Sequence, residues 1–442
     1  MVAPLTPDYR QAVLWQEQVP EEVGREGSPG GTPPLPGAVD VLVVGTGYAG
    51  LSVAREVAAA GRSVLAVDAG AVGGGASSRN GGMVIPELKA GPAALERALG
   101  PLGRRLYGDV NDAFDHVEAL AAGPSPAIAC DYERTGQLYL AHAERLVAGL
   151  RATAREHGEE LGEPVRFVPR NQLGDEVGTT AYHGGVVFER TGGLHPARFH
   201  AGLLRLALAA GATVVGGVRA TAIEARPRAT GGGFRVTTSG GTVEAGQVAL
   251  CTNAYADGLV PELERRVLPV GSFIVATEVL APELAASVSP RRRMLVDTKN
   301  FLYYWRLSPD GRLLFGGRRS LAASTVDQAR DFLYDSLVAV HPQLTGVRVH
   351  RAWGGNVAIT LDRLPHAGRV AGGAWYVTGC NGSGVALNTW MGMTLGRHLV
   401  GEGPPPSFAE LPHRAIPLHG LRRAYLPAVG LWFRWQDRGF RP

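Results

Sequence analysis

The chain has 442 residues, enough for two or three domains. Hydrophobic residues make up 45% and charged residues 19%, which is typical of a globular protein and excludes disorder as the overall state. The net charge is +4, and because only Lys89 and Lys299 are lysines, 42 of the 44 basic residues are arginines. These arginines are scattered along the chain, so the sequence argues against a nucleic-acid partner.

The cysteines and the apolar runs limit the setting in which the protein works. Cys130, Cys251 and Cys380 lie far apart with no CxxC pair, which predicts neither a disulfide framework nor a metal site. A reducing compartment, the cytoplasm, is the natural location for such a chain. Residues 1–36 contain no apolar signal core and no run reaches about 18 apolar residues, so we expect neither a secretory signal nor a transmembrane segment.

The first elements in chain order form a β-α-β unit. Residues 1–38 look like a loose arm that ends in a Gly/Pro-rich linker at 27–37. The β-branched run 39–44 predicts a buried parallel strand. A helix at 51–60 and a second buried strand at 63–67 complete the unit.

Later patterns predict a fold of mixed class, α/β together with α+β. A nucleotide-binding fold that opens at residue 39 and returns near 375 implies discontinuous domains. We expect helices at 92–121, 143–157, 196–210, 326–340 and 385–400, strands at 136–141, 213–218, 237–239, 248–250 and 375–377, and a hairpin joining 302–305 to 312–315. The expected parts are an arm at 1–38, a Rossmann-like dinucleotide-binding domain at 39–95, 190–258 and 350–405, a sheet-rich substrate domain at 96–189 and 259–349, and a tail at 406–442.

A GxGxxG motif follows the first predicted strand. Gly45 permits the tight turn, Gly47 lets the backbone approach a pyrophosphate, and Gly50 allows close packing of the helix. The N–H groups of the helix start, at Tyr48 and Ala49, can then bind phosphate. Asp68, followed by Ala69, ends the second strand, where a carboxylate can accept hydrogen bonds from ribose hydroxyls and disfavours a 2′-phosphate.

Two further glycine-rich loops point to a flavin. The loop at 73–82 exposes many N–H donors and lets a flat ring approach the backbone; its candidate cofactor residues are Ser77, Ser78, Arg79, Asn80, Gly81 and Gly82. The loop at 379–385 opens the last predicted helix, whose positive end can stabilise negative charge at the N1/O2 edge of an isoalloxazine. Its candidate residues are Asn381, Gly382, Ser383, Gly384 and Val385.

From residue 39 onward the chain resembles the D-amino-acid-oxidase superfamily of FAD-dependent enzymes, of the glycine oxidase and sarcosine oxidase type. The segments that carry the resemblance are Gly193–Pro196, Thr252–Tyr255, 267–277, 304–317 and 353–355. Cys130–Tyr132, the 79–82 loop and 408–413 look most like gamma-glutamylputrescine oxidase-like amine oxidases. The resemblance implies bound FAD, with Ala220, Thr252, Asn253 and Gly355 as further contacts, hydride transfer from a C–N bond to flavin N5, an imine product, and reoxidation by molecular oxygen to hydrogen peroxide.

Departures from the family pattern narrow the class of possible substrates and bear on how the flavin is held. The two arginines that hold a substrate carboxylate in glycine oxidase match Ser308 and Val357, so the sequence favours a small-molecule amine over an α-amino acid. The cysteine that attaches flavin in sarcosine oxidases matches Gly355, which favours noncovalent FAD.

Tyr304 and Arg306 are the candidate catalytic residues. They are two positions apart on a predicted strand, so they share a face, and Arg306 could still bind a carboxylate. Two alternatives stay open: a D-amino-acid or N-methyl-amino-acid oxidase or dehydrogenase, and a flavin-binding protein without turnover.

Overall fold

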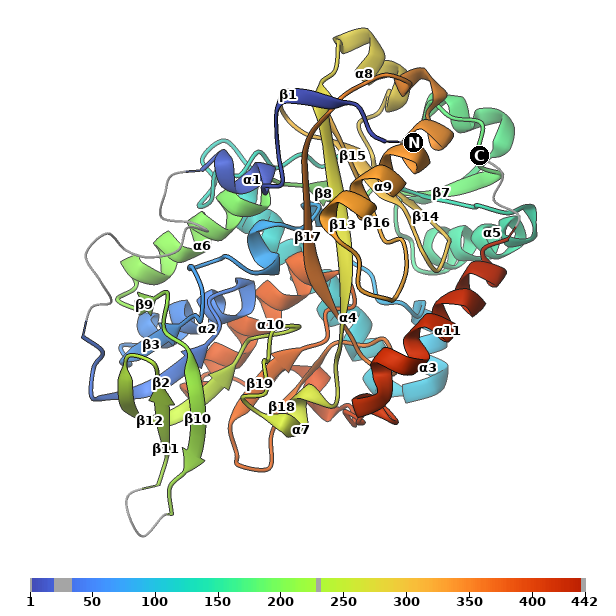
Figure 1. Cartoon of the computed structure of the whole chain (residues 1–442). Coiled ribbons are helices and arrows are strands. Elements are labelled where there is room, and N and C mark those ends of the chain that lie inside the picture. The colour runs from blue at the N-terminus through green and yellow to red at the C-terminus, as the bar shows by residue number, and fades with distance from the viewer. Residues whose placement is uncertain (1, 20–33, 228–231, 439–442) are drawn as a thin grey trace.

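The computed structural model describes residues 2–19, 34–227 and 232–438. Its two large sheets lie side by side, with the nucleotide-binding half at lower left in Figure 1 and the long strands β13 and β17 rising through the centre. The linker expected at 27–37 falls mainly on residues outside these ranges.

The nucleotide-binding half contains an eight-stranded sheet. β2 (Ala38–Val44), β3 (Val64–Val67) and β9 (Thr213–Val215) run parallel, and β12 (Gly241–Leu250) pairs in parallel with both β2 and β19 (Trp375–Thr378). β10 (Ala220–Ala225), β11 (Phe234–Thr238) and β18 (His366–Arg369) add to this sheet by antiparallel pairing. The predicted β-α-β unit is therefore confirmed.

Helices cover this sheet and bury one large apolar core. α2 (Tyr48–Ala59) packs between α6 (Pro196–Ala209) and α10 (Gly384–Leu399), and α4 (Pro101–Ala121) packs on α10. Their shared core includes the fully buried Leu51, Phe114 and Met391. This packing fixes the starts of α2 and α10, which both matter for the site.

The second half is built on a nine-stranded sheet. Its strand order is β1 (Leu5–Arg10), β17 (Val349–Ile359), β13 (Leu268–Val279), β16 (Arg312–Gly317), β15 (Tyr304–Leu307), β14 (Met294–Asp297), β5 (Gln137–Leu140), β7 (Gly184–Phe188) and β6 (Val165–Pro169). α9 (Val326–Val340) packs on β13, β16 and β17. β4 (Met83–Val84) and β8 (Gly192–Gly193) form a separate two-stranded sheet that is not hydrogen-bonded as strands to either large sheet.

The remaining α-helices of the described chain are α1 (Leu14–Glu17), α3 (Pro92–Leu99), α5 (Val147–Arg155), α7 (Pro261–Glu264), α8 (Pro282–Val288) and α11 (Arg422–Gln436). The helix expected at 92–121 is interrupted at Gly100, which has a φ of +60° and is followed by Pro101. The helix expected at 143–157 is present as a 3₁₀ turn (Glu144–Leu146), α5 and a π-helical turn (Glu156–Glu160) in succession. The hairpin predicted between 302–305 and 312–315 is present as β15 paired with β16, with its first strand two residues later than expected.

The beginning of the chain is not a loose arm. β1 pairs in parallel with β17 at the edge of the nine-stranded sheet, and Trp15 in α1 is fully buried. The polar composition of Leu5–Arg10 hides this strand from sequence patterns, because its pairing is with a segment more than 300 residues away. β17 also lies wholly in the nine-stranded sheet, so we propose to assign 349–359 to the substrate domain, not to the nucleotide-binding domain.

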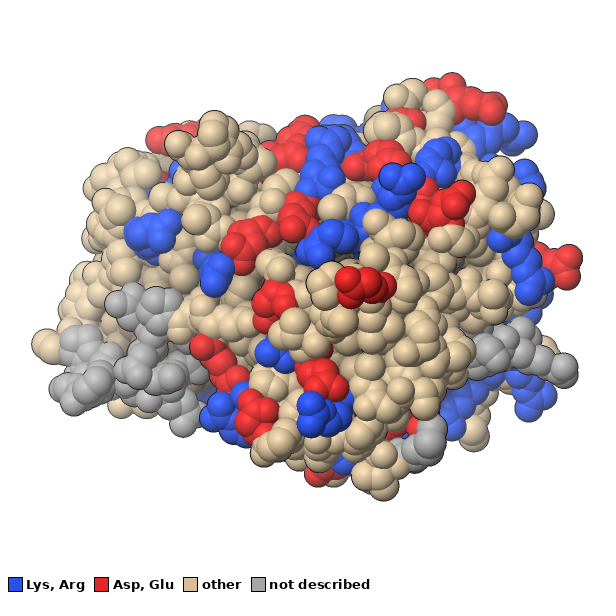
Figure 2. All heavy atoms as spheres, turned by 90° about the horizontal axis from the view of Figure 1, so that it is seen from above, with Lys and Arg blue, Asp and Glu red and all other residues tan. Residues whose placement is uncertain are grey.

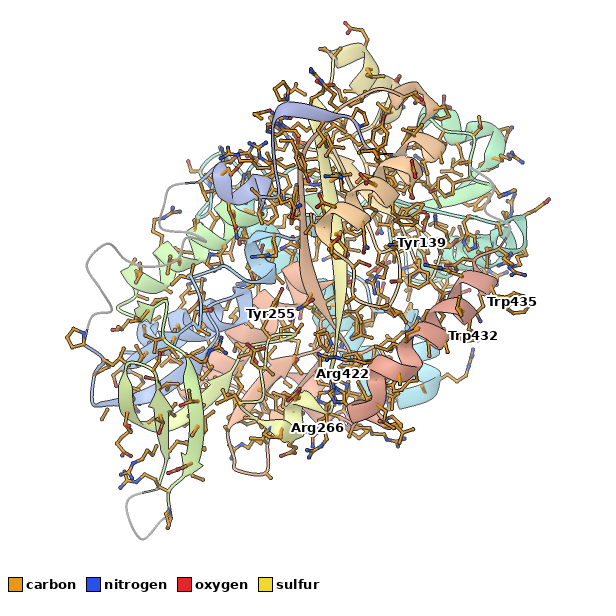
Figure 3. The ribbon with its side chains drawn as sticks, viewed as in Figure 1. Tyr139, Tyr255, Arg266, Arg422, Trp432 and Trp435 are labelled. Atoms are coloured by element: carbon orange, nitrogen blue, oxygen red, sulfur yellow. The ribbon has the colours of Figure 1, made fainter. Side chains whose placement is uncertain are left out.

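The tail ends in α11, the red helix at the right of Figure 1. Asp437 accepts hydrogen bonds from the backbone N–H groups of Asn300 (2.8 Å) and Phe301 (3.0 Å), so the tail holds the loop before β15. Trp432 and Trp435 are 53% and 59% exposed on its outer side (Figure 3). No helix in the described parts of the chain is long and apolar enough to cross a membrane.

Charges of both signs alternate over the face shown in Figure 2. Ion pairs among the charged side chains of the described chain include Arg348 with Glu278 and Arg312 with Asp310. The three cysteines are buried free thiols, and no group of three or more His, Cys, Asp or Glu within the described residues could hold a metal ion.

Candidate active site

The GxGxxG turn lies between the end of β2 and the start of α2. Gly45 has a φ of +101°, and a Cβ there would lie 2.8 Å from the carbonyl oxygen of Cys251. At Gly50 a Cβ would lie 1.8 Å from the carbonyl oxygen of Gly45, so this glycine serves packing within the turn. At Gly47 the nearest atom would be Ser77 Oγ at 2.8 Å. The turn thus leaves the N-terminus of α2 open for a phosphate group.

Asp68 shapes the same turn from the end of β3. Its Oδ2 accepts hydrogen bonds from Thr46 N (3.0 Å) and Thr46 Oγ1 (2.7 Å), and its Oδ1 accepts one from Gly70 N (3.2 Å). Asp68 also lines the large cavity described below. Its carboxylate therefore orders the phosphate turn and remains available to a ribose.

The 73–82 loop is organised by two of its own side chains. Asn80 Nδ2 donates to Tyr48 Oη (3.2 Å) and to two carbonyls of the loop, while its Oδ1 accepts from Gly82 N (2.8 Å). Arg79 donates to the carbonyls of Gly74, Gly75 and Gly354. This arginine therefore ties the loop to β17 and is fully engaged by the protein.

The 379–385 loop is held by two asparagines. Asn253 Oδ1 accepts from Gly379 N (3.1 Å), and Asn381 Oδ1 accepts from Thr360 N (3.1 Å) while its Nδ2 donates to Thr360 Oγ1 (3.1 Å). Asn381 has a φ of +49°. These contacts place the start of α10 opposite the 73–82 loop, with both loops bordering one cavity.

That cavity has a volume of about 770 Å³ and runs between the two halves of the molecule. It joins the three glycine-rich loops and the carboxyl ends of β2 and β3 to the inner face of β13, β15 and β17. Predicted residues that line it are Gly45, Gly47, Tyr48, Ala49, Asp68, Ala69, Ser77, Arg79, Asn80, Gly81, Ala220, Thr252, Asn253, Tyr304, Gly355, Asn381, Gly382, Ser383, Gly384 and Val385. Tyr255 lies between the halves in Figure 3, and its Oη accepts from Asn356 N (3.0 Å).

Four predicted site residues do not line the cavity. Gly50 packs against Gly45, Ser78 Oγ donates to the carbonyl of Gly73, and Gly82 packs against the carbonyl of Leu194, so these three support the loops. The fourth is Arg306.

Arg306, the second candidate catalytic residue, lies outside the cavity lining. It is 3% exposed, its NH2 group donates to the carbonyl of Leu194 (2.6 Å), and its guanidinium lies 5.4 Å from the ring centre of Trp15. Burial lowers the pKa of Arg306 to about 10. It shares a face with Tyr304, but α1 and β8 cover that face at Arg306, whereas the cavity begins at Tyr304.

Tyr304 faces the cavity as predicted. A Cβ at Gly81 would lie 3.1 Å from its ring, so the ring packs against the 73–82 loop. Its hydroxyl lies 3.2 Å from Ser272 Oγ, and burial raises the pKa of Tyr304. Tyr304 therefore stays protonated and can donate a hydrogen bond into the cavity.

Several lining residues could not be found from the sequence: Ile85, Glu87, Lys89, Arg219, Ser272, Arg318 and Asn356. They come from separate segments that meet only in the folded chain, and of these residues only Ser272 lies in a segment that carries the family resemblance. Lys89 pairs with Glu87 (2.7 Å) and Arg219 with Asp257 (3.1 Å), whereas Arg318 follows β16 at the cavity wall. Trp353 also lines the wall, and its Nε1 donates to the carbonyl of Arg79 (2.8 Å).

Two side chains of α1 form hydrogen bonds with the 73–82 loop. Trp15 Nε1 donates to the carbonyl of Asn80 (2.9 Å), and Gln16 Nε2 donates to Ser78 Oγ (2.6 Å). We expect Trp15→Phe, which keeps the ring but loses this donor, to weaken cofactor binding about 2- to 10-fold, since a buried hydrogen bond contributes about 0.5–1.5 kcal/mol. Equilibrium dialysis with absorbance detection measures the dissociation constant of the cofactor. Trp432→Phe, on the exposed face of α11, is the control. Equal cofactor affinity in Trp15→Phe and the wild type would show that the Trp15 hydrogen bond does not support the loop.

The fold and the cavity together define a protein of the dinucleotide-binding class. Residues 40–397 match the family model described as DAO, FAD dependent oxidoreductase. The chain is 31% identical over 404 residues to gamma-glutamylputrescine oxidoreductase of Escherichia coli, covering 90% of this chain and 93% of that protein. It is 33% identical over 422 residues to "Probable oxidoreductase OrdL" of Rhizobium meliloti, covering 92% and 94%.

The fold is similar to that of glycine oxidase from Geobacillus kaustophilus, with a TM-score of 0.71 at 20% identity, covering 86% of this chain and 99% of that one. The chain belongs to the DAO family of FAD-dependent oxidoreductases. It is an FAD-dependent oxidoreductase.

The cavity fits FAD in both shape and chemistry. Gly45 and Gly47 clear the approach to the start of α2 for the diphosphate, and Asp68 with Ala220 borders the end suited to the adenosine ribose. The 73–82 and 379–385 loops border the end suited to the isoalloxazine, next to Tyr304.

Proposed function

We propose that the protein oxidises the C–N bond of an amine that bears no carboxylate on the reacting carbon. Bound FAD would supply the redox chemistry, as the acceptor at N5 of a hydride from the carbon beside the nitrogen, and molecular oxygen would be the final acceptor, giving hydrogen peroxide. The imine product hydrolyses in water. We further propose that FAD is held without a covalent bond.

The observation that carries this proposal is the chemistry of the two positions matched to carboxylate-binding arginines. Val357 presents an aliphatic side chain to the cavity. Ser308 forms its hydrogen bonds within the β15–β16 turn. Its N–H donates to the carbonyl of Arg312 (2.8 Å), and its Oγ accepts from Arg312 N (3.0 Å). Neither position supplies the bidentate cation that a carboxylate on the reacting carbon requires.

The residues around the cavity favour an amine bound in its neutral form. Asp68, Glu87 and Asp257 line the cavity, and each carboxylate already has a partner in Thr46, Lys89 and Arg219 respectively. Tyr304 and Trp353 present ring surface, which orients an alkyl chain and excludes water. A neutral amine has a free lone pair and needs no strong base before oxidation.

An anaerobic titration of the holoenzyme, followed at the visible flavin band, tests the proposal. The panel contains gamma-glutamylputrescine, alkylamines, N-methylamines, and D- and L-α-amino acids. We expect the amines to bleach the band and the α-amino acids to leave it unchanged. Bleaching by α-amino acids alone would reject the amine assignment, and peroxide measured on readmitting air tests oxygen as the acceptor.

A second candidate, a D-amino-acid or N-methyl-amino-acid oxidase or dehydrogenase, is favoured by one observation: the cavity wall carries Arg318. Turnover with artificial acceptors but without peroxide would indicate the dehydrogenase. Reduction of the flavin by any substrate excludes a non-catalytic flavin-binding protein. The free cysteines favour a cytoplasmic location, which we include in the proposal.

A further inference from the structure

Four cationic side chains line the cavity, and three of them have partners within the protein. Arg79 donates to three backbone carbonyls, Lys89 pairs with Glu87, and Arg219 pairs with Asp257. Arg318 makes no hydrogen bond or ion pair with any residue that the structure describes. It is therefore the one lining cation in the described chain whose donors are left to a bound molecule.

The sheet places Arg318 beside two hydroxyl groups. Gly317 pairs with Phe273 at the end of β16, so Arg318 comes next to Ser272 on β13. Tyr304 pairs with Gly316 on the other side of β16, and its hydroxyl lies 3.2 Å from Ser272 Oγ. Arg318, Ser272 and Tyr304 all line the cavity. A guanidinium and two hydroxyls therefore converge on one part of the wall.

The local electrostatics call for an anion at this place. Burial lowers the pKa of Arg318, the neighbouring charge of Arg363 lowers it further, and the Tyr304 hydroxyl acts in the opposite direction. An arginine remains charged even so. Arg318 is only partly buried, because it borders the cavity. A partly buried charge that lacks a partner within the protein still has a cost, and an anion that accepts its parallel N–H groups lowers that cost.

We propose that Arg318, with Ser272 and Tyr304, forms a carboxylate-binding site, so that the substrate is an amine that also carries a carboxylate. The site belongs to the nine-stranded sheet, across the cavity from the start of α2, and so faces the substrate and not the diphosphate of FAD. This inference rests on the proposed function, which identifies the group to be oxidised as an amine. It goes further in naming the residue that selects among amines.

The site can be tested by binding alone. Holoenzyme is titrated with butanoate, and with 1-butanol as the uncharged equivalent, by calorimetry and by the flavin absorbance. We expect the wild type to bind butanoate and Arg318→Gln to bind it about 10- to 100-fold more weakly, because a hydrogen-bonded charge is lost. Arg319→Gln is the matched control, since Arg319 is the exposed next residue and should leave the Kd unchanged.

Three results would overturn the site: no butanoate binding by the wild type, equal butanoate affinity in Arg318→Gln, or a changed flavin spectrum and FAD content in Arg318→Gln with unchanged butanoate affinity. The last result would place Arg318 against the cofactor. Partial recovery in Arg318→Lys would support a charge-dependent contact.

A second set of measurements separates this inference from the proposed function. Wild type and Arg318→Gln are reduced anaerobically by butylamine, 4-aminobutanoate, 6-aminohexanoate and 2-aminobutanoate. We expect Arg318→Gln to weaken the apparent binding of an amino carboxylate while leaving that of butylamine unchanged. If no amine reduces the flavin but butanoate binding depends on Arg318, the amine proposal fails and the carboxylate site stands. If amines are oxidised with no dependence on Arg318, the function stands and the site fails. A preference for 2-aminobutanoate would place the carboxylate on the reacting carbon.

Discussion

Gly47→Leu is expected to yield a folded protein without bound FAD. A Cβ at this position lies 2.8 Å from Ser77 Oγ, which accepts the hydrogen bond of Tyr48 N (3.0 Å). The larger side chain must displace Ser77 and cover the start of α2, where the diphosphate approaches the backbone. Overpacking alone costs about 1–3 kcal/mol, and with the lost phosphate contacts we expect FAD to bind at least about 100-fold more weakly.

The measurement is the ratio of flavin to protein absorbance after gel filtration, followed by titration with free FAD. Gly108→Ala is the matched control, because Gly108 lies within α4 and a Cβ there meets no atom within 4 Å. We expect the control to be as yellow as the wild type. A yellow Gly47→Leu protein of wild-type affinity would remove the basis for placing the diphosphate at this turn.

Lys299→Met is expected to lower the free energy of unfolding by about 3–5 kcal/mol, the cost of leaving one member of a buried ion pair alone. Lys299 Nζ lies 2.8 Å from Asp297 Oδ2, and the two side chains are 5% and 0% exposed. Asp297 also accepts from Tyr303 N (3.0 Å) and Tyr182 Oη (3.1 Å). Burial raises the pKa of Asp297 and lowers that of Lys299, so each charge depends on the other.

Denaturant unfolding of the FAD-loaded protein measures this loss. Arg348→Met is the control, because Arg348 pairs with Glu278 on the surface, where an ion pair contributes about 0–1 kcal/mol. The double variant Lys299→Met with Asp297→Asn should be more stable than Lys299→Met alone, since no uncompensated charge remains. A single variant as stable as the wild type would show that the pair does not hold the loop before β15.

The structure of the nucleotide-binding half was the more predictable from the sequence. Its signals are local: Gly45, Gly47 and Gly50 stand within six residues between a buried strand and a helix, and Asp68 ends the next strand. Such short-range patterns reflect backbone requirements that only certain residues meet. The three glycine-rich loops, recognised separately, border one cavity in the folded protein.

The substrate half depends on contacts between distant segments. Tyr304 and Arg306 look equivalent from their spacing, yet the covering of the sheet by α1 and β8 leaves only Tyr304 in the cavity. Arg318 stands in no motif and acquires its place through the pairing of β16 with β13. β1 likewise becomes a strand only because β17 offers it an edge.

By itself the amino-acid sequence determined the family, the FAD cofactor and the order of the main elements, because these follow from local backbone geometry and from motifs that a single segment carries. The tertiary structure decided which polar side chains line the cavity and which form hydrogen bonds or ion pairs within the protein. That division depends on sheet register and on burial, and both are properties of segments that meet only when the chain has folded.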